Sequence, residues 1–176
     1  MSQLNPAVNK KDHIQGERTA MLELVEYGDY QCPHCGRAYP IIKNIQERLG
    51  PDLKFVFRNF PLQEIHPDAY NAALATEAAS FQDKFWEMHD IIFENQDALT
   101  MEDIFDYAKT IGLDLEQFEK DIRKVAIATK VEEDFESGMR SGVNGTPSFF
   151  VNGKKYNGDW DEHILIQYLK SQLDRV

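Results

Sequence analysis

The only two cysteines of this chain suggest its chemistry. They lie three positions apart in Cys32-Pro33-His34-Cys35, within a sequence of 176 residues. If a helix begins at Pro33, both sulfurs lie on one helix face, close enough to bond. Cys32 then lies at the helix N-terminus, where free N–H groups and the helix dipole stabilise a thiolate. Because the thiolate attacks disulfides, the motif predicts thiol–disulfide exchange.

Two other uses of these cysteines are weaker. A structural disulfide across so short a loop would restrict the unfolded chain little. A zinc site built on the motif would need a fourth ligand. No second Cys or His pair has ligand spacing, because the other histidines are scattered singly: His13, His66, His89 and His163. We therefore expect neither a metal ion nor a cofactor.

Composition narrows the class of protein. The chain is 42% hydrophobic, which is enough for a core, and its net charge is −11. That charge argues against nucleic acid and anionic membranes as partners. No apolar run approaches the roughly 20 residues of a membrane span, so no membrane insertion is expected. The polar start resembles no secretory signal. This predicts a cytoplasmic protein, or an extracytoplasmic one if the chain is a processed form. In the cytoplasm such a cysteine pair is typically catalytic or redox-sensing.

The first part of the chain predicts a strand–helix–strand unit. Residues 1–18 are polar and expected to be loose. Residues 21–27 alternate as a strand does, with Leu22, Leu24 and Glu26 on one face. A helix over 33–49 should end at Gly50-Pro51, and a second strand should follow over 53–60. The crossover length indicates a right-handed parallel unit.

The middle of the chain, 63–140, reads as almost wholly helical. We expect helices over 66–80 and 81–96, the second with Phe81, Phe85, Met88 and Ile92 on one face. Thr100 and Asp114 are predicted helix N-caps, and further helices should extend to about Arg140. Packing, rather than a cofactor pocket, is the favoured interpretation of the many aromatic and methionine side chains here.

The last part returns to strands and one helix. Residues 147–151 predict a strand, Asn152-Gly153 is typical of a type I′ hairpin, and 154–156 should return antiparallel. An amphipathic helix over 161–173 should carry Ile164, Leu165, Tyr168 and Leu169. The fold class is therefore α/β.

A parallel unit with a redox motif at its helix start, followed by a hairpin and a helix, is the thioredoxin arrangement. The sequence resembles the DsbA-like branch of that superfamily in the stretches EYGDYQCPHCGRAYP, FRNFPL, HPDA, KFWEMHD and SGVNGTPSFFVNG. The resemblance implies thioredoxin halves at 19–62 and 141–176, a helical insertion at 63–140 and an N-terminal extension at 1–18. It also implies a protein disulfide oxidoreductase that acts on protein or peptide thiols and disulfides and has a thiol redox partner.

The resemblance assigns roles to individual residues. Cys32 matches the exposed nucleophile and Cys35 the buried resolving thiol. Pro147, preceded by Thr146, matches the cis-proline loop that faces the disulfide and binds an extended substrate segment, with Pro33 beside it. DsbA-type oxidases often have an apolar residue in place of Thr146, so the net direction of electron flow stays open.

Glu26 and His34 are the candidate supporting groups. Glu26 shares a strand face with leucines, and it lies where the superfamily places a buried acid that moves protons for the resolving cysteine; a solvated Glu26 at the strand end is the alternative. His34 is expected to stabilise the thiolate, which would make the disulfide more oxidising; a solvated spacer is the alternative. For the whole chain, a redox-switched binding module and a glutathione-dependent transferase-like protein are the competing functions.

Overall fold

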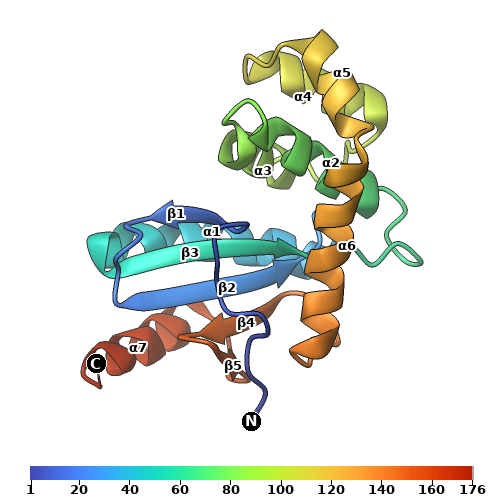
Figure 1. The fold of residues 1–176 in the computed structure, drawn as a ribbon. Coiled ribbons are helices and arrows are strands. Elements are labelled where there is room, and N and C mark those ends of the chain that lie inside the picture. The colour runs from blue at the N-terminus through green and yellow to red at the C-terminus, as the bar shows by residue number, and fades with distance from the viewer. Residues whose placement is uncertain (176) are drawn as a thin grey trace.

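The central sheet joins the first and last parts of the chain. The computed structural model describes residues 1–175, which contain a five-stranded sheet in the order β1-β3-β2-β4-β5. β2 (Leu22–Gly28) and β3 (Leu53–Asn59) run parallel, while β4 (Ser148–Val151) pairs antiparallel with β2 and β5 (Lys154–Tyr156) with β4. The predicted α/β class and thioredoxin arrangement are confirmed (Figure 1).

Two helices pack against one face of this sheet. α1 (Pro33–Leu49) follows β2 and leads through the short 3-10 turn η1 (Gly50–Asp52) into β3, and α7 (Glu162–Leu173) packs beside α1. Leu22 and Leu24 point to this face and belong to its buried core. Because side chains alternate along a strand, Glu26 points the same way. The expected strand, helix and strand boundaries are confirmed to within a residue or two.

The N-terminal segment covers the opposite face, contrary to the expectation that residues 1–18 are loose. It crosses the sheet and forms β1 (His13–Gly16), antiparallel to β3 (Figure 1). Leu4 is buried in an apolar cluster with Val25, Tyr27 and Val56. The physical reason is Arg58 on β3, whose guanidinium is buried and binds Asp12 at 2.8 Å. A buried guanidinium needs such partners, so it holds the polar segment in place.

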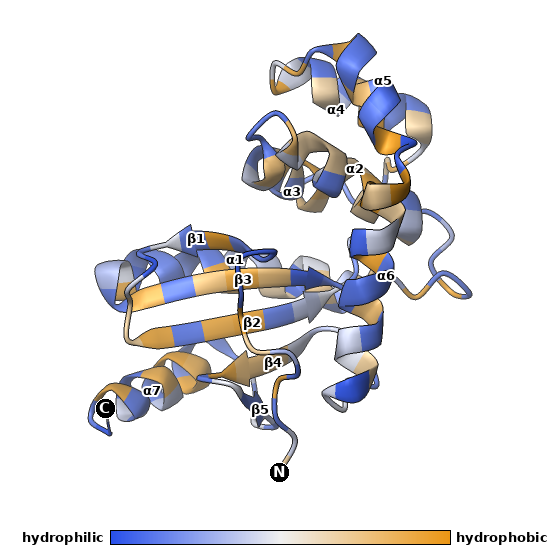
Figure 2. Cartoon of the chain, viewed as in Figure 1, coloured by the Kyte–Doolittle hydropathy of each residue, from blue (hydrophilic) through white to orange (hydrophobic). Residues whose placement is uncertain are grey.

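Most of the inserted helices lie on the β1 and β3 side of the sheet (Figure 1). The inserted helices are α2 (Ala69–Ser80), α3 (Phe85–Phe93), α4 (Met101–Thr110), α5 (Leu115–Ile122) and α6 (Val125–Arg140). Thr100 forms a capping box with Asp103, and the Asp114 side chain caps α5, as predicted. α6 runs from this helical layer down to β4 (Figure 1). The strands carry the most continuous hydrophobic colouring, whereas the outer turns of α4 and α5 are polar (Figure 2).

Three side chains lie elsewhere than predicted. Phe81 is 51% exposed, because α3 begins only at Phe85 and Phe81 lies in the preceding turn. In α7 the apolar stripe consists of Leu165, Ile166 and Leu169, so Ile164 and Tyr168 face outward. None of the helices within residues 1–175 has the length and apolar character needed to cross a membrane.

Candidate active site

The two cysteines lie where β2 meets α1. Cys32 is the N-cap of α1 and Pro33 its first residue, so the sulfur of Cys32 lies beside the free N–H groups of the first turn. Both cysteines are free thiols. Cys32 is only 4% exposed and Cys35 is fully buried. The predicted order of accessibility holds, although Cys32 is more covered than an exposed nucleophile was expected to be.

Hydrogen bonding and burial shift the pKa values of the two thiols in opposite directions. The Cys35 thiol and the backbone N–H groups of Cys35 and His34 lower the pKa of Cys32 to about 5, against burial, which raises it. The side chain of Thr146 acts in the same direction. Burial raises the pKa of Cys35 well above its usual value, and its hydrogen bond to Cys32 adds to this. Cys32 is therefore a thiolate at neutral pH and Cys35 a thiol.

Glu26 is buried on β2, the strand that precedes the cysteines. Its Oε1 atom finds no hydrogen-bond partner within residues 1–175. Burial, reinforced by the charge of Cys32, raises the pKa of Glu26 to about 8. The charge of Glu26 in turn contributes to the raised pKa of Cys35. The solvated alternative is thereby excluded, and a carboxyl group with this pKa can exchange protons near neutrality.

The loop before β4 faces the cysteines from the other side. The Thr146–Pro147 peptide bond is cis, as the resemblance implies. The Sγ atom of Cys32 lies 3.6 Å from the carbonyl oxygen of Thr146. Pro33 is exposed next to Cys32. Thr146, Pro147 and Pro33 therefore all lie close to the Cys32 sulfur.

His34 occupies the exposed side of the motif. Its ring nitrogen Nδ1 accepts a hydrogen bond from the guanidinium of Arg37, one turn further along α1. The group of His34 that lowers the pKa of Cys32 is its backbone N–H. The role expected for the imidazole stays a prediction, whereas the backbone contribution follows from the position of His34 in the first helical turn.

Asp29 organises the active-site turn, a role that the sequence interpretation did not assign to its side chain. Its Oδ1 atom accepts hydrogen bonds from the N–H groups of Gln31 (2.8 Å) and Cys32 (3.1 Å). Its Oδ2 atom accepts one from the N–H of Leu62 (2.9 Å) and lies 2.7 Å from Nδ1 of His66. The backbone N–H of Asp29 donates to Sγ of Cys35 at 3.5 Å. An aspartate three residues before a predicted N-cap is a turn signal that would have pointed to it.

Gln96 fixes the same turn from the helical insertion. Its side-chain amide donates to the carbonyl oxygens of Tyr30 and Cys32, both at 2.9 Å. Gly36 makes room for it, because a Cβ atom at that position would overlap the Gln96 side chain. Nothing in the local sequence around Gln96 marks this contact.

Aromatic packing completes the floor of the site. The Tyr30 hydroxyl lies 3.0 Å from Nδ1 of His89, and rings of the insertion, including Phe93, surround both residues. Burial lowers the pKa of His89 well below its usual value, so the ring is neutral. These rings therefore pack in the protein core. Within residues 1–175, no three His, Cys, Asp or Glu side chains are grouped as metal ligands.

Comparison with known proteins agrees with this geometry. A family model described as thioredoxin matches residues 8–174. This chain belongs to the thioredoxin family. Within that family, it superposes on BdbD from Bacillus subtilis in its oxidised form with a TM-score of 0.83 and 27% identity, covering 98% of this chain and 97% of that one. Its fold is that of the DsbA-like thiol–disulfide oxidoreductases.

Two further relatives extend the comparison of this thioredoxin-family chain. A thioredoxin-like oxidoreductase from Silicibacter pomeroyi shares the fold, with a TM-score of 0.85, 24% identity and coverage of 96% of this chain and 95% of that one. The chain is also 44% identical over 170 residues to the Na(+)/H(+) antiporter NhaA 1 of Mycobacterium sp. (strain KMS). That match covers 96% of this chain but 28% of the antiporter, so the chain spans less than a third of such relatives.

Proposed function

We propose that this protein exchanges disulfides with protein or peptide substrates, with Cys32 as the nucleophile and Cys35 as the resolving thiol. The observation that carries the proposal is the opposite displacement of two neighbouring thiol pKa values. The pKa of Cys32 is lowered to about 5 at a helix N-terminus, and that of Cys35 is raised in the protein interior. A thiolate that attacks first and a buried thiol that attacks second are what two-step exchange requires.

The reaction balances as a two-electron exchange. The Cys32 thiolate attacks one sulfur of a substrate disulfide, forms a mixed disulfide and releases the other substrate sulfur as a thiolate. Cys35 then loses its proton to the Glu26 carboxylate and attacks the Cys32 sulfur. The second substrate thiolate leaves, so the substrate is reduced and the Cys32–Cys35 pair is oxidised. Run in reverse, the same steps oxidise a substrate dithiol.

The cis-proline loop supplies the place for the substrate chain in this proposal. Thr146 lies against the Cys32 sulfur, and Pro147 and Pro33 flank it. A backbone in this position can hydrogen-bond an extended segment while its cysteine reaches Sγ. A thiol redox partner of the same general kind would reset the cysteine pair. The stabilised thiolate of Cys32 favours the reduced form, which makes the disulfide a better oxidant.

Alkylation and turnover test the proposal together. The rate of iodoacetamide labelling of Cys32 in the reduced protein should follow a midpoint near pH 5, and Cys35 should label far more slowly. Catalysed reduction of insulin should vanish in Cys32→Ser, whereas Cys35→Ser should accumulate mixed disulfide. A labelling midpoint at the ordinary value near 9.0, or insulin reduction by Cys32→Ser at the wild-type rate, would contradict it.

The relatives favour a second candidate function, a redox-responsive domain that acts on a transporter. The match to NhaA 1 covers nearly all of this chain and a minor part of the antiporter. In this candidate function the Cys32–Cys35 pair is oxidised or reduced, and the transporter binds the two redox forms differently, without repeated turnover of a substrate. Binding of a purified antiporter that differs between the oxidised and reduced protein, with no catalysed insulin reduction, would favour this candidate over the first.

A further inference from the structure

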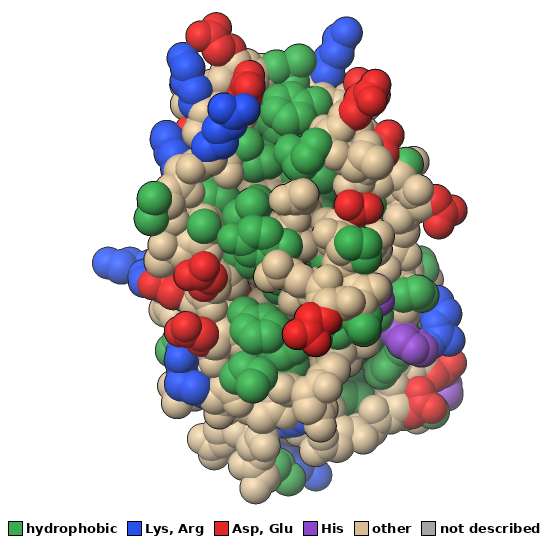
Figure 3. Space-filling view, turned by 90° about the vertical axis from the view of Figure 1, so that its right-hand side faces the viewer, with side chains coloured by type: hydrophobic (Ala, Val, Ile, Leu, Met, Phe, Trp, Pro, Cys, Tyr) green, Lys and Arg blue, Asp and Glu red, His purple; other side chains and the backbone are tan. Residues whose placement is uncertain are grey.

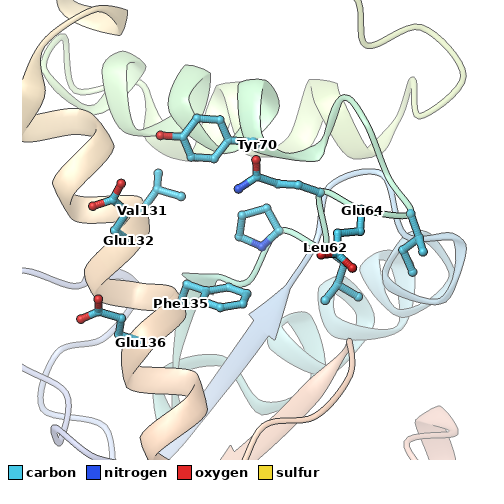
Figure 4. A pocket seen from close by; sticks show the side chains of 10 residues that line it. Leu62, Glu64, Tyr70, Val131, Glu132, Phe135 and Glu136 are labelled. Atoms are coloured by element: carbon cyan, nitrogen blue, oxygen red, sulfur yellow. The ribbon is translucent and has the colours of Figure 1, made fainter.

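A hollow opens between the loop after β3 and two helices of the insertion, α2 and α6. It encloses about 690 Å³. Its walls are apolar side chains from the loop, from α2 and from α6: Pro61, Leu62, Ile65, Tyr70, Val131 and Phe135. Figure 4 shows Tyr70 of α2 and Phe135 of α6 directed into the space, with Leu62 across from them. None of these residues takes part in the exchange steps.

The apolar surface here is open to solvent. Ile65 is 68% exposed, although a branched aliphatic side chain gains free energy from burial. Figure 3 views the side of the molecule on which α6 and this loop lie, and shows hydrophobic side chains gathered along the middle of the face with acidic ones beside them. Exposed apolar surface bordered by charge is typical of a binding site.

The charges at this hollow have one sign. Glu64, Glu132 and Glu136 line it, and no Lys, Arg or His does so within residues 1–175. Glu132 and Glu136 are exposed and one turn apart on α6, so their carboxylates border the same opening. Burial and the charge of Glu132 raise the pKa of Tyr70, which places that carboxylate near the apolar wall. A segment that carries Lys or Arg next to an apolar residue complements this site.

The hollow is joined to the active-site turn through one carboxylate. Asp29 accepts hydrogen bonds from Cys32 N–H and from Leu62 N–H, so the nucleophile and a wall residue of the hollow share one buried anchor. β2 and β3 are parallel neighbours, so the loops that follow them leave the same end of the sheet. The loop that carries Leu62 and the turn that carries Cys32 therefore lie side by side, both bound to Asp29.

We propose that this hollow is a substrate subsite that takes an apolar side chain flanked by Lys or Arg, a few residues from the substrate cysteine. The inference rests on the proposed exchange function and adds the class of substrate to it. Basic, partly unfolded segments with an accessible cysteine are the substrates it selects. The carboxylates of Glu64, Glu132 and Glu136, which form the rim of the hollow, raise the rate of encounter with a basic segment. The apolar wall binds the apolar side chain and so fixes the position of the segment.

Dithiol peptides that differ only in charge test this subsite. The oxidised protein would be mixed with peptides of one sequence that carry Leu beside either two Lys or two Glu, and with dithiothreitol as a small dithiol. At low salt the Lys peptide should be oxidised about tenfold faster than the Glu peptide, as a few partly exposed charge pairs allow. Replacing its Leu by Ser should slow the reaction severalfold.

The matched variants separate the subsite from the overall negative charge. Glu132→Lys/Glu136→Lys should abolish or invert the preference, whereas Glu47→Lys/Glu102→Lys, which changes the same number of exposed charges elsewhere, should keep it. All variants should oxidise dithiothreitol at the wild-type rate. A preference that persists in the rim variant, or that is lost equally in the control, would overturn the subsite. Failure of the wild type with dithiothreitol would instead overturn the exchange function.

Discussion

Two buried glutamates in this molecule have opposite surroundings. Glu26 on β2 and Glu77 on α2 are 3% and 2% exposed. Oε1 of Glu26 has no partner within residues 1–175, and burial raises the pKa of Glu26 to about 8. The carboxylate of Glu77 lies 2.8 Å from Nε2 of His13 and accepts a hydrogen bond from Asn59 at 2.9 Å. Although burial opposes it, these contacts hold the pKa of Glu77 below its usual value.

The difference shows what partners do to a buried carboxyl group. Glu77 stays charged because it is bound, and it links the N-terminal strand, β3 and the helical insertion. Glu26 is held next to two thiols without such partners, so its proton is available near neutral pH. A buried carboxylate with partners stays charged and stabilises the fold, whereas a buried carboxyl group without partners binds and releases a proton near neutral pH.

The largest expected effect concerns the paired glutamate. Glu77→Ala removes the partner of His13 and Asn59, and breaking such a buried pair should lower the free energy of unfolding by roughly 3 kcal/mol. Urea denaturation at pH 7 followed by circular dichroism measures this. Glu116→Ala, which breaks an exposed pair with Lys120, is the control and should change stability by less than about 0.5 kcal/mol. Equal losses in both variants would contradict the structural role of Glu77.

The unpaired glutamate should matter to rate rather than to stability. Glu26→Gln keeps the shape of the side chain but removes the proposed proton acceptor for Cys35, so resolution of the mixed disulfide should slow about a hundredfold near neutral pH. First attack by Cys32 should be nearly unchanged. Quenched-flow trapping of a mixed disulfide with a model peptide separates the two steps. Glu77→Gln is the control and should resolve at the wild-type rate; equal rates for Glu26→Gln and wild type across pH 6–8 would defeat the proposal.

The pH dependence of stability should separate Glu26 from Cys32 in the reduced protein. The pKa of Glu26 is raised from 4.5 to about 8, so the stability it contributes below 4.5 is lost as the pH rises to 8. The pKa of Cys32 is lowered from 9.0 to about 5, so its contribution above 9 is lost as the pH falls to 5. Between pH 5 and 8 the two effects oppose each other, each with a slope of about 1.4 kcal/mol per pH unit.

Substituting Glu26 or Cys32 should remove its contribution to the dependence of stability on pH. Relative to wild type, Glu26→Gln should gain stability as the pH rises from 5 to 8, and Cys32→Ser should lose it over the same range. Urea midpoints at half-unit intervals of pH measure both. Parallel curves for the two variants and wild type would show that neither group titrates as inferred.

The smallest effect is expected at the link between the insertion and the active-site turn. Gln96→Ala removes two hydrogen bonds to the carbonyls of Tyr30 and Cys32. It should cost about 1 kcal/mol of stability and slow exchange severalfold through a looser turn. Gln82→Ala is matched, because Gln82 bonds both backbone groups of Asp114 far along the chain from the cysteines. Gln82→Ala should leave the exchange rate unchanged. An equal loss of exchange rate in Gln82→Ala and Gln96→Ala would show that Gln96 acts through stability alone.

Local patterns allowed much of the fold to be predicted. Proline after Cys32 starts α1, Thr100 and Asp114 start α4 and α5, and Asn152-Gly153 turns the last hairpin with both residues at positive φ. Each of these signals works within a few residues of chain, through a missing N–H, a capping oxygen or a tolerated backbone angle. The wrong expectation for residues 1–18 came from the same source, because no local signal tells that Arg58 on a distant strand needs Asp12.

The sequence by itself determined the chemistry of this protein: the spacing of Cys32 and Cys35, the helix start between them, and an acid on the buried face of the strand before them. Only the tertiary structure decided how those groups behave. It placed Thr146 against the Cys32 sulfur, left Glu26 Oε1 without a partner in the described chain, and brought Asp29 and Gln96 onto the active-site turn. The physical reason is that a pKa or an anchored turn depends on burial and on atoms within a few ångströms, and residues far apart in sequence supply many of those atoms.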